Sequence, residues 1–233
     1  MNDTFPRPGR VLVTGGASGL GAAVVAAVRS AGGQPVVLDR DQVPGDGILS
    51  YALDVSDRSA VAAAVLEAAE ALGGLDAVVT AAGIDRCGRL DEVEAAEWER
   101  VIMVNLLGTA NVVRAALPHL LKTHGRVVTV ASSLGLKAVS EATAYCASKF
   151  GVIGFTRALA AETRGQIGVT TLIPAGMATR FFDDRDEKYR PQDDSRLNDP
   201  ARVAAAVTFA LGQPTGCEVR ELVITHEEDD SWP

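Results

Sequence analysis

Short runs of consecutive apolar residues alternate with helix-like segments along almost the whole chain of 233 residues. Such runs are typical of strands buried on both faces, as in parallel sheets whose crossovers are helices. The predicted strands are 10–14, 35–39, 48–53, 76–80, 125–131, 169–173 and 219–225. The predicted helices are 19–31, 56–72, 95–104, 145–163 and 201–211. The helix at 95–104 continues or restarts through 109–121. This order predicts an α/β fold with one doubly wound parallel sheet and helices on both faces.

No linker divides the chain, so we expect a single domain over 10–225. A short flexible lead at 1–9 precedes it, and an acidic tail at 226–233 follows it. The regular alternation breaks at 181–200, which is dense in charge, and we expect a lid above the sheet edge within 177–200. Trp232 in the tail is a candidate for docking on a surface or a partner subunit.

The net charge of −8 and the pI of about 4.9 argue against a nucleic-acid partner and an anionic membrane surface, because both need a basic face. No apolar run reaches about 18 residues without Gly, Pro or a charge, so no membrane span is expected. The N-terminus lacks the apolar region of a secretory signal. Three scattered cysteines, Cys87, Cys146 and Cys217, give no disulfide framework and no metal motif. We therefore expect a cytoplasmic protein without a metal site.

A glycine-rich turn joins the first predicted strand to the first predicted helix. It reads TGGASGLG from Thr14, a G-x-x-x-G-x-G spacing that differs from the general G-x-G-x-x-G. Such a turn lets the backbone approach a pyrophosphate, and the helix N-terminus adds N–H donors and a favourable dipole. The pattern predicts a Rossmann-type dinucleotide site rather than a plain turn. Its expected contacts are Gly15, Ser18, Gly19, Leu20 and Gly21.

Asp39 ends the second predicted strand. A carboxylate there binds both ribose hydroxyls of the adenosine and repels a 2′-phosphate. It therefore favours NAD(H) as the cofactor over NADP(H), although Arg40, the next residue, works against this preference. The alternative is an aspartate that only forms the turn at the strand end.

Tyr145 and Lys149 are four residues apart in a predicted helix, so their side chains lie on one face, one turn apart. A nearby ammonium stabilises phenolate and lowers the tyrosine pKa from about 10 toward neutrality. A tyrosine tuned in this way serves as a general acid or base near neutral pH. The same spacing also occurs on solvated helix faces, so its meaning depends on the rest of the chain.

Five motifs follow one another along the chain: TGGASGLG, TAAG at 80–83, MVNLLG around Asn105, VASSLG around Ser132 and YCASK at 145–149. In order and spacing they resemble the short-chain dehydrogenase/reductase family over 10–225. The resemblance implies that Tyr145 exchanges a proton with the substrate oxygen, while Lys149 lowers its pKa and holds the nicotinamide ribose. It implies that Ser132 hydrogen-bonds the substrate oxygen and that Asn105 helps to hold a relay water.

The serine assignment rests on spacing. Ser132 is preferred because its distance from Tyr145 resembles that of the family, and Ser133 is the runner-up. Further cofactor contacts implied by the resemblance are Asp54 and Val55 at the adenine, Ala82 and Gly83 in TAAG, and Pro174, Gly176 and Thr179 around the nicotinamide. TAAG stands where the family usually has NNAG, so an asparagine contact is missing, and Thr80 is the candidate to replace it in part.

The predicted function is an NAD-dependent oxidoreductase, an alcohol dehydrogenase or carbonyl reductase that transfers hydride between nicotinamide and a secondary alcohol or ketone. Two alternatives are a non-catalytic dinucleotide sensor or scaffold, and a nucleotide-sugar dehydratase or epimerase, whose relatives resemble longer chains. The resemblance implies a homodimer or homotetramer through 109–121 and 145–163. The charges at 181–198 do not suggest a wholly apolar substrate pocket. Cys87 is a further candidate substrate contact, and Cys146 a packing residue.

Overall fold

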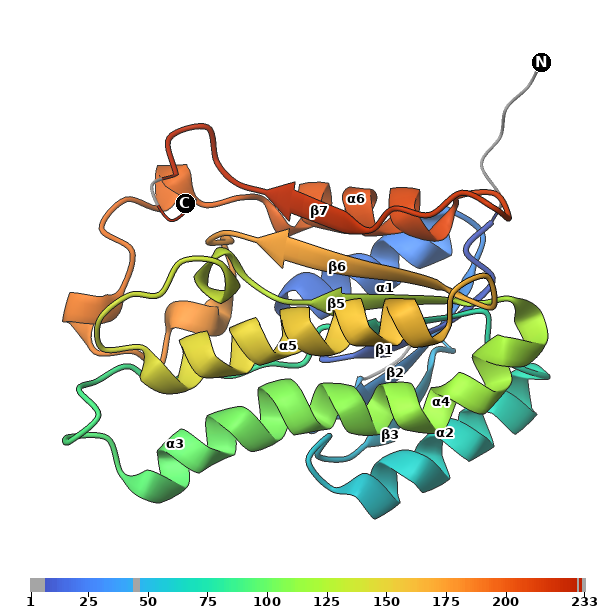
Figure 1. Cartoon of the computed structure of the whole chain (residues 1–233), viewed down its shortest axis with the longest axis horizontal. Helices are drawn as coiled ribbons and strands as arrows, with labels where there is room; N and C mark the ends of the chain where they lie inside the picture. The colour runs from blue at the N-terminus through green and yellow to red at the C-terminus, as the bar shows by residue number, and fades with distance from the viewer. Residues whose placement is uncertain (1–6, 44–46, 230, 232–233) are drawn as a thin grey trace.

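The computed structural model describes residues 7–43, 47–229 and 231. Seven strands form one sheet in the order β3-β2-β1-β4-β5-β6-β7, and every neighbouring pair is parallel (Figure 1). The strands are β1 (Arg10–Thr14), β2 (Gln34–Asp39), β3 (Leu49–Ala52), β4 (Ala77–Thr80), β5 (Arg126–Val130), β6 (Gly168–Pro174) and β7 (Glu221–Ile224). The predicted doubly wound α/β fold is confirmed.

Helices cover both faces of the sheet (Figure 1). They are α1 (Gly19–Ser30) and α6 (Pro200–Leu211) on one face, and α2 (Arg58–Leu72), α4 (Thr109–Thr123) and α5 (Thr143–Glu162) on the other. Successive residues of a strand point to opposite faces. In β1, Val13 therefore packs into one core with Val24 and Val207, whereas Leu12 packs into the other with Val112. All five side chains are fully buried.

One continuous helix runs from Ala95 to Thr123, made of α3 (Ala95–Ile102), a π-helical turn η1 (Met103–Gly108) and α4. The predicted segments 95–104 and 109–121 are thus a single element. Within the described residues this helix alone is long and apolar enough to meet a length-and-composition test for a membrane span. A core helix passes the same test, and Val112 and Leu120 of this helix are buried against the sheet.

Helix boundaries differ from the prediction by one to a few residues, as helix ends commonly do. Helix α2 is capped by Asp57, whose Oδ1 accepts hydrogen bonds from the N–H groups of Ser59 (2.9 Å) and Ala60 (3.0 Å). Helix α5 begins at Thr143, so Tyr145 lies in its first turn rather than at its start.

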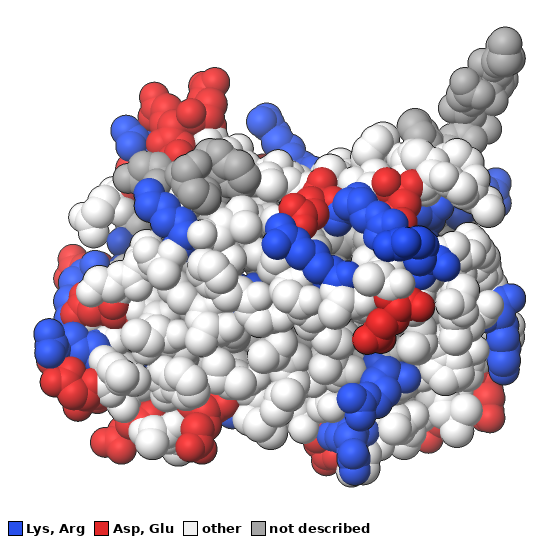
Figure 2. All heavy atoms as spheres, viewed as in Figure 1, with Lys and Arg blue, Asp and Glu red and all other residues white. Residues whose placement is uncertain are grey.

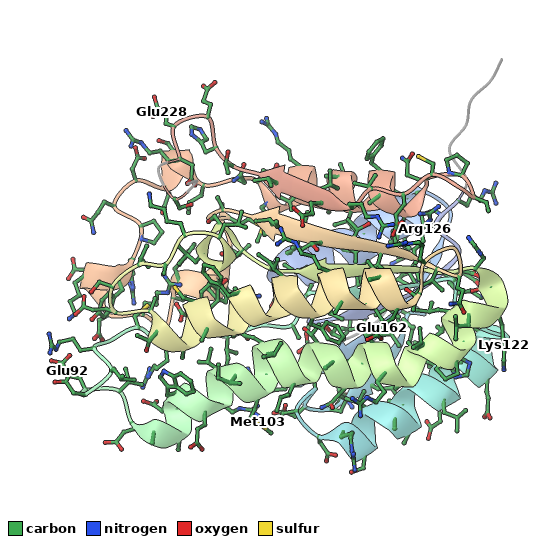
Figure 3. The ribbon with its side chains drawn as sticks, in the orientation of Figure 1. Glu92, Met103, Lys122, Arg126, Glu162 and Glu228 are labelled. Carbon is green, nitrogen blue, oxygen red and sulfur yellow. The ribbon has the colours of Figure 1, made fainter. Side chains whose placement is uncertain are left out.

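The sheet order places a topological switch between β1 and β4, because the chain moves outward from β1 through β2 to β3 and then returns to β4. In open α/β sheets, ligands bind in the crevice outside the carboxyl ends of the strands at this point. The loops after β1, β4, β5 and β6 all emerge at that edge (Figure 1). Figure 3 shows Glu92, after β4, and Glu228 of the tail at this end of the molecule, with Lys122 and Arg126 at the other.

The segment expected as a lid lies between β6 and α6. It contains three short 3₁₀ helices, η3 (Arg180–Phe182), η4 (Glu187–Tyr189) and η5 (Asp194–Arg196). A bridge between Met177 and Asn198 ties its two ends together. The lid is therefore an excursion from one strand end rather than a separate unit.

Candidate active site

The turn between β1 and α1 is so tight that only glycine fits at several of its positions. Gly15 and Gly19 have φ values of 70° and 52°, in the left-handed region. A Cβ at Gly21 would lie 2.0 Å from the carbonyl oxygen of Gly15, and one at Gly15 would lie 2.9 Å from the Cα of Ala82. The turn therefore packs directly against the loop after β4, with its backbone exposed to whatever binds at the edge.

The amino terminus of α1 suits an anion. Ser18, its N-cap residue, makes no side-chain capping bond, and the first turn carries no acidic residue, so no side chain neutralises the N–H donors and the positive end of the dipole. Thr179 of the lid faces this turn, since a Cβ at Gly19 would lie 3.6 Å from the Thr179 Cβ. Leu20 would contact a pyrophosphate only through its backbone, because its side chain is buried in the core. These residues fit a dinucleotide pyrophosphate.

Asp39 stands at the carboxyl end of β2, beside the glycine turn. Its carboxylate accepts hydrogen bonds from the N–H of Ala17 (2.9 Å) and of Asp41 (3.1 Å). It therefore braces the turn, which is the structural role weighed above, and it remains only partly buried. Both interpretations of Asp39 are compatible with this position.

The carboxylate of Asp54 already has a protein partner, which the sequence did not indicate. Its carboxylate forms an ion pair with Arg100 of α3 and accepts hydrogen bonds from Ser56 N (2.9 Å) and Ser56 Oγ (2.7 Å). Burial alone would raise the pKa of Asp54, but the bonds from Arg100 and Ser56 outweigh it and lower the pKa to about 2. Val55 is buried in the core, and its carbonyl accepts a bond from Asn111 Nδ2 (3.2 Å).

The structure brings the four predicted catalytic residues together. The Tyr145 side chain lies close to that of Ser132, which lowers the pKa of the tyrosine. The Nζ of Lys149 lies 5.5 Å from the centroid of the Tyr145 ring and donates to the carbonyl of Val130 (2.9 Å). A Cβ at Gly83 would lie 3.4 Å from Asn105 Oδ1 and 3.6 Å from Lys149 Nζ, so the TAAG loop closes one side of this cluster.

Asn105 has its side chain fully engaged by protein groups. Its Oδ1 accepts from the N–H of Ile84 (2.8 Å), and its Nδ2 donates to the carbonyl of Ile84 (2.9 Å) and to Ser148 Oγ (3.0 Å). The residue lies in the π-helical turn η1, a distortion that often marks functional sites. In this structure the side chain fixes the loop after β4 to α5.

The expected direction of the Tyr145 pKa is wrong for the protein alone. Burial raises the pKa of Tyr145 above its ordinary value and outweighs the hydrogen bond with Ser132, which lowers it. Burial also lowers the pKa of Lys149 from 10.5 to about 8, with the charge of Asp85 opposing this shift. In the protein alone, burial therefore favours the neutral form of both side chains.

The two serines have different neighbours. Ser132 lies close to Tyr145, and its Oγ accepts from Leu134 N (3.1 Å). The Oγ of Ser133 instead accepts from Ser231 Oγ in the tail (2.7 Å). The expectation for Trp232 falls outside the described residues, as do residues 1–6 of the lead.

The lid closes over Tyr145. Phe181 lies with its ring centroid 5.8 Å from that of Tyr145 and 5.7 Å from that of Phe182. Pro174 ends β6, and a Cβ at Gly176 would lie 2.7 Å from Leu197 Cδ2, so the strand end presses against the lid. An ion pair between Asp85 and Arg185 joins the loop after β4 to the lid; no sequence spacing could have indicated it.

Thr80, the residue at the first position of TAAG, is buried at the end of β4, and its Oγ1 has no hydrogen-bond partner. Cys146 is buried, as expected for a packing residue. Burial and the nearby Asp85 raise the pKa of the Cys87 thiol to about 12, so it is no nucleophile. Within the part of the chain that the structure describes, no three His, Cys, Asp or Glu side chains gather as metal ligands.

Comparison with known proteins agrees with this arrangement. The family model described as short chain dehydrogenase matches residues 10–190. The L-fucose dehydrogenase of Mus musculus is 33% identical over 235 residues, covering 92% of this chain and 86% of that relative. The D-threitol dehydrogenase of Mycolicibacterium smegmatis is 34% identical over 191 residues, covering 76% and 74%.

Solved structures share the fold. An alcohol dehydrogenase from the archaeon Thermococcus sibiricus, complexed with 5-hydroxy-NADP, superposes with a TM-score of 0.86 at 24% identity, covering 95% of this chain and 97% of that one. The ligand-free aldohexose dehydrogenase of Thermoplasma acidophilum gives 0.84 at 23% identity, covering 94% and 95%. This chain belongs to the short-chain dehydrogenase/reductase family, whose members are oxidoreductases that bind nicotinamide dinucleotides.

Proposed function

We propose that this protein is an NAD-preferring dehydrogenase or reductase acting between a secondary alcohol and the matching ketone, with Tyr145 as the general acid and base. The observation that carries the proposal is the cluster of Tyr145, Ser132 and Lys149 at the carboxyl edge of the sheet, beside a glycine turn that suits a pyrophosphate. A non-catalytic dinucleotide sensor would not need such a buried and mutually oriented set.

Each residue of this cluster has a definite task. Ser132 and the Tyr145 side chain hold the substrate oxygen. In reduction the Tyr145 phenol gives its proton to that oxygen and becomes phenolate, and in oxidation the phenolate takes the proton of the alcohol and becomes the phenol again. Lys149, held by the Val130 carbonyl, places a positive charge near the phenol and stabilises phenolate during oxidation. The nicotinamide, when bound, accepts or supplies the hydride. Asn105 keeps the loop after β4 fixed against α5.

The cofactor contacts lie at the carboxyl ends of five strands, β1, β2, β3, β4 and β6, and on α5. The proposed set is Gly15, Ser18, Gly19, Leu20, Gly21, Asp39, Asp54, Val55, Ala82, Gly83, Pro174, Gly176 and Thr179, together with Tyr145 and Lys149. Asp39 favours NAD(H), because its carboxylate at the end of β2 repels a 2′-phosphate. Arg100, through its ion pair with Asp54, fixes the carboxylate proposed for the adenine end.

Fluorescence titration with NADH and NADPH tests the cofactor proposal. NADH is expected to bind about tenfold or more tightly than NADPH, which corresponds to about 1.4 kcal/mol. Asp39→Ala is expected to remove this gap, whereas Asp41→Ala, an exposed neighbour of Asp39, is expected to keep it. Equal affinities in the wild type would contradict the NAD preference, and no binding of either nucleotide would favour the non-catalytic scaffold.

The names of two relatives support a hydroxylated small molecule as substrate, because L-fucose and D-threitol both carry several secondary hydroxyls. A panel of sugars, polyols, simple secondary alcohols and ketones tests the reaction itself, read as formation or loss of NADH. Turnover of at least one secondary alcohol or ketone is expected. A failure of every member, in a protein that binds NADH, would contradict the proposed reaction.

We also propose a homodimer or homotetramer that uses the outer faces of α4 and α5. Three large apolar side chains on these helices and the adjoining η1 remain over 40% exposed in the single chain: Leu107 of η1 (43%), Leu121 of α4 (42%) and Phe150 of α5 (45%). Figure 2 shows a broad uncharged area across this side of the molecule, over α5 and its neighbour. Exposed apolar side chains within such an uncharged area are typical of a protein interface.

A further inference from the structure

A buried ion pair lies at the mouth of the proposed active site. Asp85 belongs to the loop after β4, and Arg185 lies in the lid between η3 and η4. Arg185 Nη2 donates to Asp85 Oδ2 over 2.5 Å. The Asp85 side chain is 4% exposed and that of Arg185 17% exposed. Burying two charges is costly, and an apolar pair would often be as stable, so the pair calls for an explanation other than stability.

The ion pair lies next to the reacting tyrosine. The guanidinium of Arg185 stacks 4.6 Å from the ring centroid of Phe182 and 5.4 Å from that of Phe181, which itself contacts Tyr145. The charges of Asp85 and Arg185 both act on the Tyr145 hydroxyl, with opposite signs. The ion pair is therefore linked to the Tyr145 ring through Phe181, and both of its charges act on the Tyr145 hydroxyl.

Arg185 differs from the other charged residues of the lid around it. The neighbouring side chains at 183, 184, 186, 187 and 188 belong to exposed residues, whereas Arg185 points inward. Its Nη1 donates to the carbonyl of Tyr189 (3.3 Å), but its Nε is buried without a hydrogen-bond partner. Among side chains of the described residues, the other such atom is Thr80 Oγ1, at the same edge of the sheet. Buried donors are nearly always satisfied, so an unsatisfied one marks a position for a ligand acceptor.

We propose that Asp85 and Arg185 determine substrate specificity by binding hydroxyl groups next to the reacting carbon of a neutral polyhydroxylated substrate, an open-chain polyol or a sugar. This inference rests on the function proposed above and names the residues that select the substrate class. A hydroxyl group both donates and accepts, so it matches a carboxylate acceptor and an Nε donor held side by side. The pair is neutral as a whole, and the Asp85 carboxylate disfavours an anionic substrate.

Matched substrates and variants test this role. The substrates are threitol and 2-butanol, two secondary alcohols with four carbons, of which only threitol carries additional hydroxyls. The variants are Arg185→Met, Asp85→Asn and the double variant, which removes both charges together. The control is Arg196→Met, which removes an exposed lid arginine paired with Asp193 and Glu228. NADH affinity is measured for every protein.

The wild type is expected to have kcat/KM at least about 100-fold higher for threitol than for 2-butanol, since sites that hydrogen-bond a substrate hydroxyl strongly reject analogues lacking it. Arg185→Met and Asp85→Asn are expected to lower kcat/KM for threitol by about 30-fold or more and for 2-butanol by less than about threefold. NADH affinity and the behaviour of Arg196→Met are expected to match the wild type.

Two results would overturn the role of the ion pair and leave the proposed function intact. One is a wild type that oxidises 2-butanol as well as threitol. The other is an equal loss on both substrates in the single variants, which would mean that the pair only holds the lid. The comparison of threitol with 2-butanol in the wild type tests the proposal even if a variant does not fold. A protein that binds NADH but oxidises no alcohol would instead refute the proposed function, and the substrate inference with it.

Discussion

Replacing Lys149 by methionine is expected to stabilise the protein while inactivating it. Lys149 is 5% exposed, and burial lowers its pKa from 10.5 to about 8, with Asp85 opposing the shift. Because a tenfold change in an equilibrium is worth about 1.4 kcal/mol, this difference means that the buried charge costs about 3 kcal/mol at neutral pH. Losing the hydrogen bond to Val130 costs about 1 kcal/mol. The variant should therefore gain about 2 kcal/mol in its free energy of unfolding.

The pH dependence gives an independent check with a definite sign. A lysine whose pKa is lower in the folded chain than in the unfolded chain loses its proton first in the folded chain as pH rises. The free-energy cost of burying the Lys149 charge is therefore complete below about pH 8 and decreases between about pH 8 and 10.5. From about pH 7 to 9.5 the wild type should gain about 2 kcal/mol from this group, and Lys149→Met should lack that gain. The raised pKa of Tyr145 matters only at higher pH.

Urea unfolding followed by circular dichroism at both pH values, without nucleotide and at one protein concentration, measures these differences. Lys122→Met removes an exposed lysine from the end of α4 and is expected not to stabilise the protein. A Lys149→Met protein less stable than the wild type would refute the reasoning. So would equal pH dependence in the two proteins.

Three further changes have defined outcomes. Gly21→Ala would place a Cβ 2.0 Å from the Gly15 oxygen and so strain the turn by about 3 kcal/mol. NADH affinity measured by fluorescence should therefore fall about 100-fold, and unchanged affinity would contradict this. The side-chain hydrogen bond from Arg10 holds the pKa of Asp76 below its ordinary 3.8, so its stabilisation is full above about pH 4 and is lost as pH falls. Asp76→Asn should cost about 1 kcal/mol at neutral pH and flatten the acid unfolding curve, and an unchanged curve would argue against that role. Phe150→Asp should lower the mass found by light scattering to that of a monomer, and a wild type that is already monomeric would rule out the proposed interface.

The fold could be predicted because strands that are buried on both faces appear in the sequence as runs of consecutive apolar residues. The strands β1, β2 and β4 contain the consecutive apolar runs VLV, PVVL and AVV, which alternating strands of an exposed sheet would not show. Tyr145 and Lys149 could be paired for a similarly local reason, since a spacing of four on a helix brings them together whatever the rest of the chain does.

Other features depend on contacts that no local pattern contains. Asp85 and Arg185 are 100 residues apart, and they meet only because the lid returns over the loop after β4. Arg100 and Asp54, which form another ion pair, are 46 residues apart. The direction of the Tyr145 pKa was missed because a neighbouring charge can be read from spacing, whereas the degree of burial cannot.

Tyr145→Phe tests the central claim most directly, because it removes one hydroxyl and leaves the ring that contacts Phe181. NADH affinity and the single-turnover rate of oxidation or reduction of the best substrate would be measured on the same preparations. The account predicts that Tyr145→Phe still binds NADH and loses rate by about 1,000-fold or more, within the range of general acid–base catalysis. A Tyr145→Phe protein that keeps most of the wild-type rate would contradict it.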